Sequence, residues 1–97
     1  AQIRSFRAHH AILTVSAIDE QTGIMDFNIH EAQIARAMIK QAKSVTVLAD
    51  SSKFGRIASF EVCEMKRITN LVCERRPPEK IEQRILDAGV TLISVEK

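Results

Sequence analysis

The chain has 97 residues, of which 45% are hydrophobic and 27% are charged, and its formal net charge is +2. This length predicts one small globular domain or a part of one. The basic residues are spread along the chain, which argues against nucleic-acid binding by this segment. The sequence has no apolar stretch near the roughly 20 residues of a membrane span and no secretory signal pattern at its start. We therefore expect no contact with a membrane.

Cysteine and histidine occur without the spacing of a metal site. Cys63 and Cys73 have no partner motif, so free thiols in a reducing cytoplasm are expected rather than a disulfide or a zinc site. His9, His10 and His30 also lack metal-ligand spacing. We expect no metal and no cofactor. The first residues lack an initiator Met and are typical of the end of a helix, so we expect a piece of a longer protein.

The first half of the chain changes from a strand pattern to a helix pattern. Residues 10–16 form a continuous apolar and β-branched run, typical of a strand covered on both faces. A polar stretch with Gly23 follows. Asn28 is suited to cap a helix, and Glu31 three residues later completes a capping-box pattern. The apolar residues after this cap recur at helical spacing, at Ile34, Ala35, Met38, Ile39 and Ala42.

The second half repeats the alternation of strands and helices. The pattern predicts a strand at 45–49, an irregular stretch through Val62, a strand at 69–73, a helix from Pro77 to Gly89 and a last strand at 90–95. Helices between strands imply right-handed crossovers and a mainly parallel sheet. The sequence therefore predicts an α/β fold without an internal repeat.

The most informative segment is the polar turn Asp-Ser-Ser-Lys that follows the strand at 45–49. In open α/β sheets, ligands bind at the carboxyl ends of the strands. Asp50 offers acceptor oxygens there, and Lys53 offers a compact positive charge suited to a phosphate or a carboxylate. The alternative is a purely structural turn, in which Asp50 and Ser51 bond to the backbone and Gly55 takes a positive φ.

Asp19 is a further candidate because it ends the first predicted strand region. Its side chain is expected to point into the same crevice as Asp50 and Lys53, and polar groups that converge from adjacent strand ends make a binding site. The alternative is an Asx-turn before Gly23. The residues by themselves leave a binding site and ordinary turns as open alternatives.

Several short motifs occur here in the order found in one protein family. They are Ser16-Ala17-Ile18-Asp19, Met25-Asp26-Phe27-Asn28, Glu31-Ala32, Arg36-Ala37-Met38 and the string from Ala49 to Gly55. From about Phe6 to Val95, the chain resembles the second part of the C-terminal effector domain of the DeoR family, which comprises bacterial transcriptional repressors of sugar metabolism. Asp26-Phe27 with His30-Glu31 is most similar to the glycerol-3-phosphate type of repressor.

The resemblance implies a three-layer α/β fold with a mainly parallel sheet, like that of ribose-5-phosphate isomerase and glucosamine-6-phosphate deaminase (the NagB/RpiA/CoA transferase-like fold). It implies that residues 1–97 are the C-terminal portion of a sugar-phosphate sensor domain. The family's DNA-binding winged helix and Gly/Ser/Thr-rich phosphate loop do not occur in this sequence. The implied partners are a phosphorylated sugar or similar effector, further copies of the chain in a homodimer or higher oligomer, and DNA only through the absent N-terminal domain.

The resemblance also implies roles in effector binding for individual residues, none of them catalytic. Lys53 would neutralise a phosphate or hold a sugar hydroxyl, and Asp50 would accept hydrogen bonds from hydroxyls. Asp26 and Phe27 would line the site, with Phe27 either excluding water or anchoring the core. Glu31 is similar to the general base of the isomerase-like enzymes. Since a repressor needs binding and no turnover, a hydrogen bond from Glu31 to a sugar hydroxyl is expected.

Two other functions stay open at this level. One is a fragment of a sugar-phosphate isomerase or deaminase that uses Glu31 as its base, and the other is an oligomerisation module without a ligand. The chain also departs from the family pattern at two places. Ala17 stands where the family has Gly, and Cys73-Glu74 stands where it has Thr-Asp. These departures leave the identity of the effector open.

Overall fold

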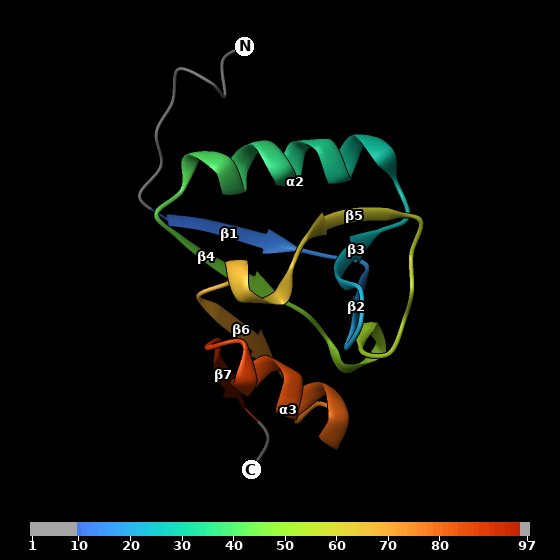
Figure 1. Cartoon of the computed structure of the whole chain (residues 1–97), viewed down its shortest axis with the longest axis vertical. Coiled ribbons are helices and arrows are strands. Elements are labelled where there is room, and N and C mark those ends of the chain that lie inside the picture. The colour runs from blue at the N-terminus through green and yellow to red at the C-terminus, as the bar shows by residue number, and fades with distance from the viewer. Residues whose placement is uncertain (1–9, 96–97) are drawn as a thin grey trace.

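The described residues form short strands with two α-helices between them (Figure 1). A computed structural model describes residues 10–95 of the protein. Its elements are β1 (His10–Thr14), β2 (Ala17–Asp19), β3 (Gly23–Asp26), α2 (Ile29–Gln41), β4 (Ser44–Leu48), η1 (Ser51–Lys53), β5 (Phe60–Cys63), η2 (Met65–Arg67), β6 (Asn70–Cys73), α3 (Glu79–Asp87) and β7 (Thr91–Ser94).

The main sheet has the strand order β1-β4-β6-β7, and its neighbouring strands are all parallel. Residues that pair across parallel strands share a face, and one such row runs from Leu13 through Val47 and Leu71 to Leu92. Val47 and Leu71 are fully buried at the centre of the core. This arrangement confirms the predicted α/β class with a mainly parallel sheet.

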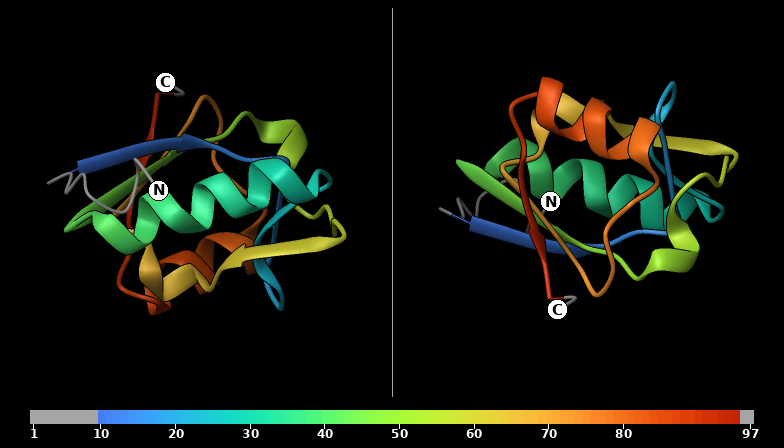
Figure 2. Two further views of the ribbon diagram at one scale, coloured as in Figure 1. Left: turned by 90° about the horizontal axis from the view of Figure 1, so that it is seen from above. Right: turned by 90° about the horizontal axis from the view of Figure 1, so that it is seen from below.

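Both α-helices cover the same face of this sheet (Figure 2). α2 buries Ala32, Ala35 and Ile39, and α3 buries Ile81 and Ile85, in one core with the strands. The small alanine side chains allow α2 to approach the sheet closely. Within residues 10–95, the α-helices leave the other face of the sheet open. These residues therefore form two layers of the predicted three-layer arrangement.

A second, antiparallel sheet has the strand order β2-β3-β5. The sequence predicted a polar stretch without strands around Gly23 and an irregular stretch through Val62. Both predictions are wrong, because β2 and β3 occupy the first place and β5 begins at Phe60 in the second. Its strands have three or four residues, too few to show a repeating pattern. Gly23 allows the close pairing: its φ is +78°, and a Cβ there would lie 2.8 Å from the Cys63 carbonyl oxygen.

The two cysteines and the two α-helices test what the sequence predicted about disulfides and membrane spans. Cys63 and Cys73 are free thiols, as predicted. Burial raises the pKa of Cys63 to about 11 and also raises the pKa of Cys73. Both thiols are therefore poor nucleophiles at neutral pH, since the thiolate is the reactive form. Neither α-helix of residues 10–95 is long and apolar enough to cross a bilayer.

Candidate functional site

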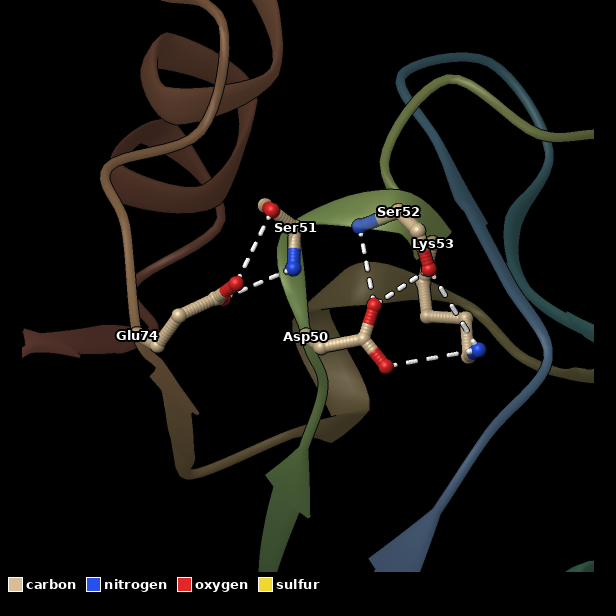
Figure 3. Close-up of polar contacts among 5 residues, drawn as sticks. All are labelled: Asp50, Ser51, Ser52, Lys53 and Glu74. Carbon is tan, nitrogen blue, oxygen red and sulfur yellow. Dashed lines mark hydrogen bonds and ion pairs between the residues drawn. The ribbon is translucent and has the colours of Figure 1, made fainter.

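The polar turn after β4 lies at the carboxyl edge of the main sheet (Figure 3). Because β1, β4 and β6 are parallel, their carboxyl ends meet at this edge. Asp50 caps η1 by accepting a hydrogen bond from the Ser52 backbone N–H at 2.9 Å. The Ser52 hydroxyl donates to the same carboxylate oxygen. One oxygen of Asp50 therefore has the structural role that the sequence left as an alternative.

Lys53 lies beside Asp50 with its ammonium loosely held (Figure 3). Its Nζ is 3.4 Å from Asp50 Oδ2 and 3.5 Å from Ser52 Oγ. Charge-assisted hydrogen bonds are usually about 2.7–2.9 Å long, and a lysine has three N–H donors. The hydrogen bonds from Ser52, together with the Lys53 ammonium, lower the pKa of Asp50. Asp50 is thus ionised at neutral pH, and Lys53 keeps donor capacity for a ligand.

Glu74 is a member of the site that the sequence showed only as a departure from the family pattern. It follows β6 and accepts hydrogen bonds from the Ser51 backbone N–H at 2.7 Å and from the Ser51 hydroxyl at 2.9 Å (Figure 3). Partial desolvation raises the pKa of Glu74, but the hydrogen bonds from Ser51 and from the backbone of Glu74 together outweigh it, and the net shift is downward. Its position directly after a parallel strand, which also singled out Asp50, is the signal that could have identified it.

The second sheet holds the other end of the turn. The Gly55 backbone N–H donates to the Ile18 carbonyl at 2.7 Å, and Phe54 forms a β-bridge with Ile18. Gly55 has a φ of +83°, as its structural interpretation expects. The turn that carries Lys53 is therefore fixed between β6 on one side and β2 on the other.

Two crevices open at this edge, and Lys53 lines both of them. The first has a volume of about 480 Å³, and its polar lining residues include Asp50, Lys53 and Glu74. The second, of about 420 Å³, runs between β1 and α2 and is lined by Asp26, Glu31 and Lys53 together with apolar side chains. In the described part of the chain, Lys53 is the one Lys or Arg that lines either crevice. Carboxylates around a single ammonium suit a ligand with hydroxyl groups and one anionic group.

The start of α2 differs from the predicted capping box. Asn28 caps the helix as predicted, because its side-chain oxygen accepts hydrogen bonds from the N–H groups of His30 and Glu31. Its own N–H donates to Asp26 Oδ1 at 2.9 Å, so the prediction that Glu31 accepts this N–H is wrong. Asp26 is buried in β3, directly before the cap, and is already in place to accept it. Glu31 is exposed and lines the second crevice. Ile34, one of the apolar residues that recur at helical spacing, is also exposed and lines the same crevice.

Asp19 and Phe27 do not lie where they were expected. Asp19 ends β2, and its Oδ2 accepts hydrogen bonds from the backbone N–H groups two and three residues further on, at 3.0 and 3.3 Å. Since the chain leaves the main sheet after Thr14, Asp19 lines neither crevice and the expected convergence with the polar turn is wrong. Phe27 is 52% exposed and lines neither crevice, so it is neither a shield of these crevices nor a core anchor.

A larger hollow, of about 760 Å³, lies away from the strand ends, between the β2–β3 turn, η2 and α3. Its charged lining residues are mainly acidic and comprise Glu20, Glu61, Glu64, Asp87, Lys66 and Arg84. It contains none of the predicted site residues. Among residues 10–95, no group of three or more potential ligands is arranged to hold a metal ion. Chemistry rather than volume therefore selects the carboxyl edge as the candidate site.

The fold and the site together define a class of protein. A mainly parallel sheet with polar crevices at its carboxyl edge is the arrangement in which α/β domains bind small ligands. The family described as the DeoR C terminal sensor domain matches residues 1–75. The chain belongs to this family, as its motifs predicted, and its fold is the sugar-phosphate-binding type shared with the isomerase-like enzymes.

Three bacterial relatives illustrate this membership. The HTH-type transcriptional repressor CsqR of Escherichia coli K12 is 26% identical over 91 residues, which cover 94% of this chain and 35% of the relative. The glycerol-3-phosphate regulon repressor of the same strain is 30% identical over 90 residues, covering 93% and 36%. The HTH-type transcriptional repressor GlcR of Bacillus subtilis 168 is 30% identical over 96 residues, covering 99% and 37%.

The chain thus spans about a third of the length of the curated relatives it matches. These relatives are transcriptional repressors, and the family to which the chain belongs is not one of enzymes. This membership confirms the prediction of a non-enzymatic chain. The glycerol-3-phosphate repressor and GlcR are equally identical to it, at 30%.

Proposed function

We propose that the chain is the C-terminal portion of the effector-binding domain of a cytoplasmic bacterial regulator of sugar metabolism. In this proposal, the domain senses a phosphorylated sugar or a related metabolite and modulates DNA binding by a longer protein. The winged helix that binds DNA and the phosphate loop belong to parts outside these 97 residues. Membership of the sensor-domain family and the repressor names of the relatives support this function.

The position of Lys53 is the observation that carries the proposal. Lys53 lines both crevices, and the contacts of its ammonium to Asp50 and Ser52 are long. An anionic group of the effector offers Lys53 shorter contacts than these. The half-buried side chain strengthens such an ion pair relative to one in open solvent. Lys53 is therefore the proposed contact for the charged group of the effector.

The surrounding carboxylates are proposed to bind the hydroxyl groups of the effector. Asp26 and Glu31 line one side of Lys53, and Asp50 and Glu74 line the other. Ionised carboxylates accept hydrogen bonds and donate none, so they favour a polyhydroxylated ligand over a polyanionic one. Since Glu31 does not complete a capping box, a ligand contact is the proposed reason for its place in the crevice.

Effector binding reaches both sheets through the turn that carries Lys53. Glu74 ties this turn to β6, and the Gly55 N–H ties it to β2. A ligand that draws Lys53 towards it therefore also shifts the hydrogen bonds by which the turn is attached to the main sheet and to the second sheet. In the longer protein, binding shifts a conformational equilibrium, and operator affinity changes by linkage.

NMR titration of the isotope-labelled chain tests this proposal with three probes: glucose 6-phosphate, glycerol 3-phosphate and inorganic phosphate. Amide shifts are expected around the polar turn and at the start of α2. Lys53→Ala is expected to weaken binding of the tightest organic phosphate by about tenfold to a hundredfold, since a hydrogen bond to a charged group contributes about 1.5–3 kcal/mol. Lys66→Ala is the matched control, because Lys66 is exposed, pairs with Glu64 and lines neither crevice.

Equal affinity in the wild type and Lys53→Ala would refute the role of Lys53. Binding of inorganic phosphate as tightly as of both organic phosphates would refute recognition of hydroxyl groups by the carboxylates. Isomerase or deaminase turnover that Glu31→Ala abolishes would support the enzymatic alternative instead.

A further inference from the structure

Glu74 reaches from the end of β6 to the polar turn after β4. Its carboxylate accepts hydrogen bonds from the Ser51 backbone N–H at 2.7 Å and from the Ser51 hydroxyl at 2.9 Å. Each oxygen of Glu74 accepts one of these bonds, so two donors of one residue fix where the carboxylate lies (Figure 3). An ionised carboxylate has about four acceptor sites. Glu74 therefore brings a fixed negative charge with spare acceptor capacity to the first crevice, which it lines.

Both carboxylates at the first crevice are ionised at neutral pH. Hydrogen bonds from Ser52 lower the pKa of Asp50. At Glu74, partial desolvation raises the pKa, but the hydrogen bonds from Ser51 and from its own backbone together outweigh it. The charged lining residues of this crevice are thus two carboxylates and the single ammonium of Lys53. The crevice has an excess of negative charge.

The negative charge of Glu74 is not neutralised by the described part of the protein. Within residues 10–95, Lys53 pairs with Asp50 at 3.4 Å, whereas Glu74 forms no ion pair. Its hydrogen-bond donors on Ser51 are neutral groups. An anionic group of a ligand beside Glu74 therefore meets a like charge, which opposes binding. A hydroxyl group at the same place donates a hydrogen bond to the carboxylate instead.

We propose that Glu74 determines the specificity of the site by excluding a second anionic group from the first crevice. The effector then carries one anionic group, which Lys53 contacts, and presents hydroxyl groups to Glu74. A binding site discriminates between ligands by repulsive elements as well as by attractive contacts, and the fixed carboxylate of Glu74 is such an element. This inference rests on the proposed function, in which Lys53 contacts the charged group of the effector.

Glutamine at this position separates specificity from support of the turn. Its side-chain oxygen accepts the Ser51 N–H, and its amide N–H donates to the Ser51 hydroxyl oxygen, so Glu74→Gln keeps two contacts of similar length. The charge alone is lost. A residue that only supports the turn is expected to tolerate this change without altering the choice of ligand, whereas a residue that excludes anions is expected to alter it.

NMR titration of the isotope-labelled chain compares glucose 6-phosphate with glucose 1,6-bisphosphate, which differ by one phosphate group. The wild type is expected to bind the bisphosphate more weakly than the monophosphate. Glu74→Gln is expected to strengthen binding of the bisphosphate by about twofold to fivefold relative to the monophosphate, the range for one exposed pair of charges. This gain is expected to shrink in about 1 M salt, which screens exposed charges.

Glu64→Gln is the matched control, because it also removes one negative charge, but Glu64 pairs with Lys66 and lines neither crevice. It is expected to leave the ratio of the two affinities unchanged. Glu74→Ala removes the support of the turn along with the charge and is expected to lose the discrimination as well. The amide spectrum of each free variant checks that the fold is retained.

A ratio of affinities that stays the same in Glu74→Gln, or that changes equally in Glu64→Gln, would overturn the role of Glu74. A wild type that binds the bisphosphate at least as tightly as the monophosphate would overturn it too. In both cases, binding of glucose 6-phosphate that Lys53→Ala weakens leaves the proposed function standing. If neither glucose phosphate nor glycerol 3-phosphate binds the wild type, the proposed function fails and this inference fails with it.

Discussion

Gly23 offers the sharpest test of how the second sheet is built. Its φ is +78°, a left-handed conformation that costs other L-residues roughly 1–2 kcal/mol. A Cβ added there would lie 2.8 Å from the Cys63 carbonyl oxygen. That oxygen belongs to the backbone, so β3 and β5 must move apart, and overpacking of this kind costs about 1–3 kcal/mol. Gly23→Ala is therefore expected to lower the free energy of unfolding by about 2–5 kcal/mol.

Gly89 provides the matched control, since its φ is +83° and nothing lies within 4 Å of an added Cβ. Gly89→Ala keeps the conformational strain without the clash, so a loss of only about 1–2 kcal/mol is expected. Urea unfolding followed by circular dichroism measures both losses, with an unchanged denaturant slope as the check on two-state behaviour. Losses that agree within about 0.5 kcal/mol would refute the reasoning that the approach to Cys63 makes glycine necessary at this position.

Two further predictions concern the α2 cap and the buried thiol. Asn28→Ala is expected to lower the free energy of unfolding by about 1 kcal/mol and Asn28→Asp to preserve most of it, in the same urea experiment; unchanged stability in Asn28→Ala would contradict the cap. Burial raises the pKa of Cys63 from 9.0 to about 11, so the native state holds its proton longer than the unfolded state and stability should fall from pH 9 to about 11. Mass spectrometry should show slow alkylation of Cys63 at pH 8 relative to free cysteine, and rapid labelling of the folded chain would contradict its burial.

The main sheet could be predicted from the sequence because its signals are local. Its strands are apolar and β-branched runs, and α2 and α3 separate them with a cap at Asn28 and a stop at Gly89. The second sheet could not be predicted in this way. Its strands are too short to show a period, and their pairing depends on Gly23 approaching Cys63, which is far away in the sequence.

The candidate site was also predictable where its residues follow the main sheet, and not where they belong to the second sheet. The polar turn was located correctly because it directly follows a strand of the main sheet, and Asp50 and Lys53 lie there side by side. Asp19 was misplaced because the chain enters the second sheet before it reaches that residue. Two explanations of Glu31 fit the sequence equally well: a capping box with Asn28 and a contact to a ligand. Only the geometry, in which Asp26 accepts the N–H that a capping box assigns to Glu31, separates them.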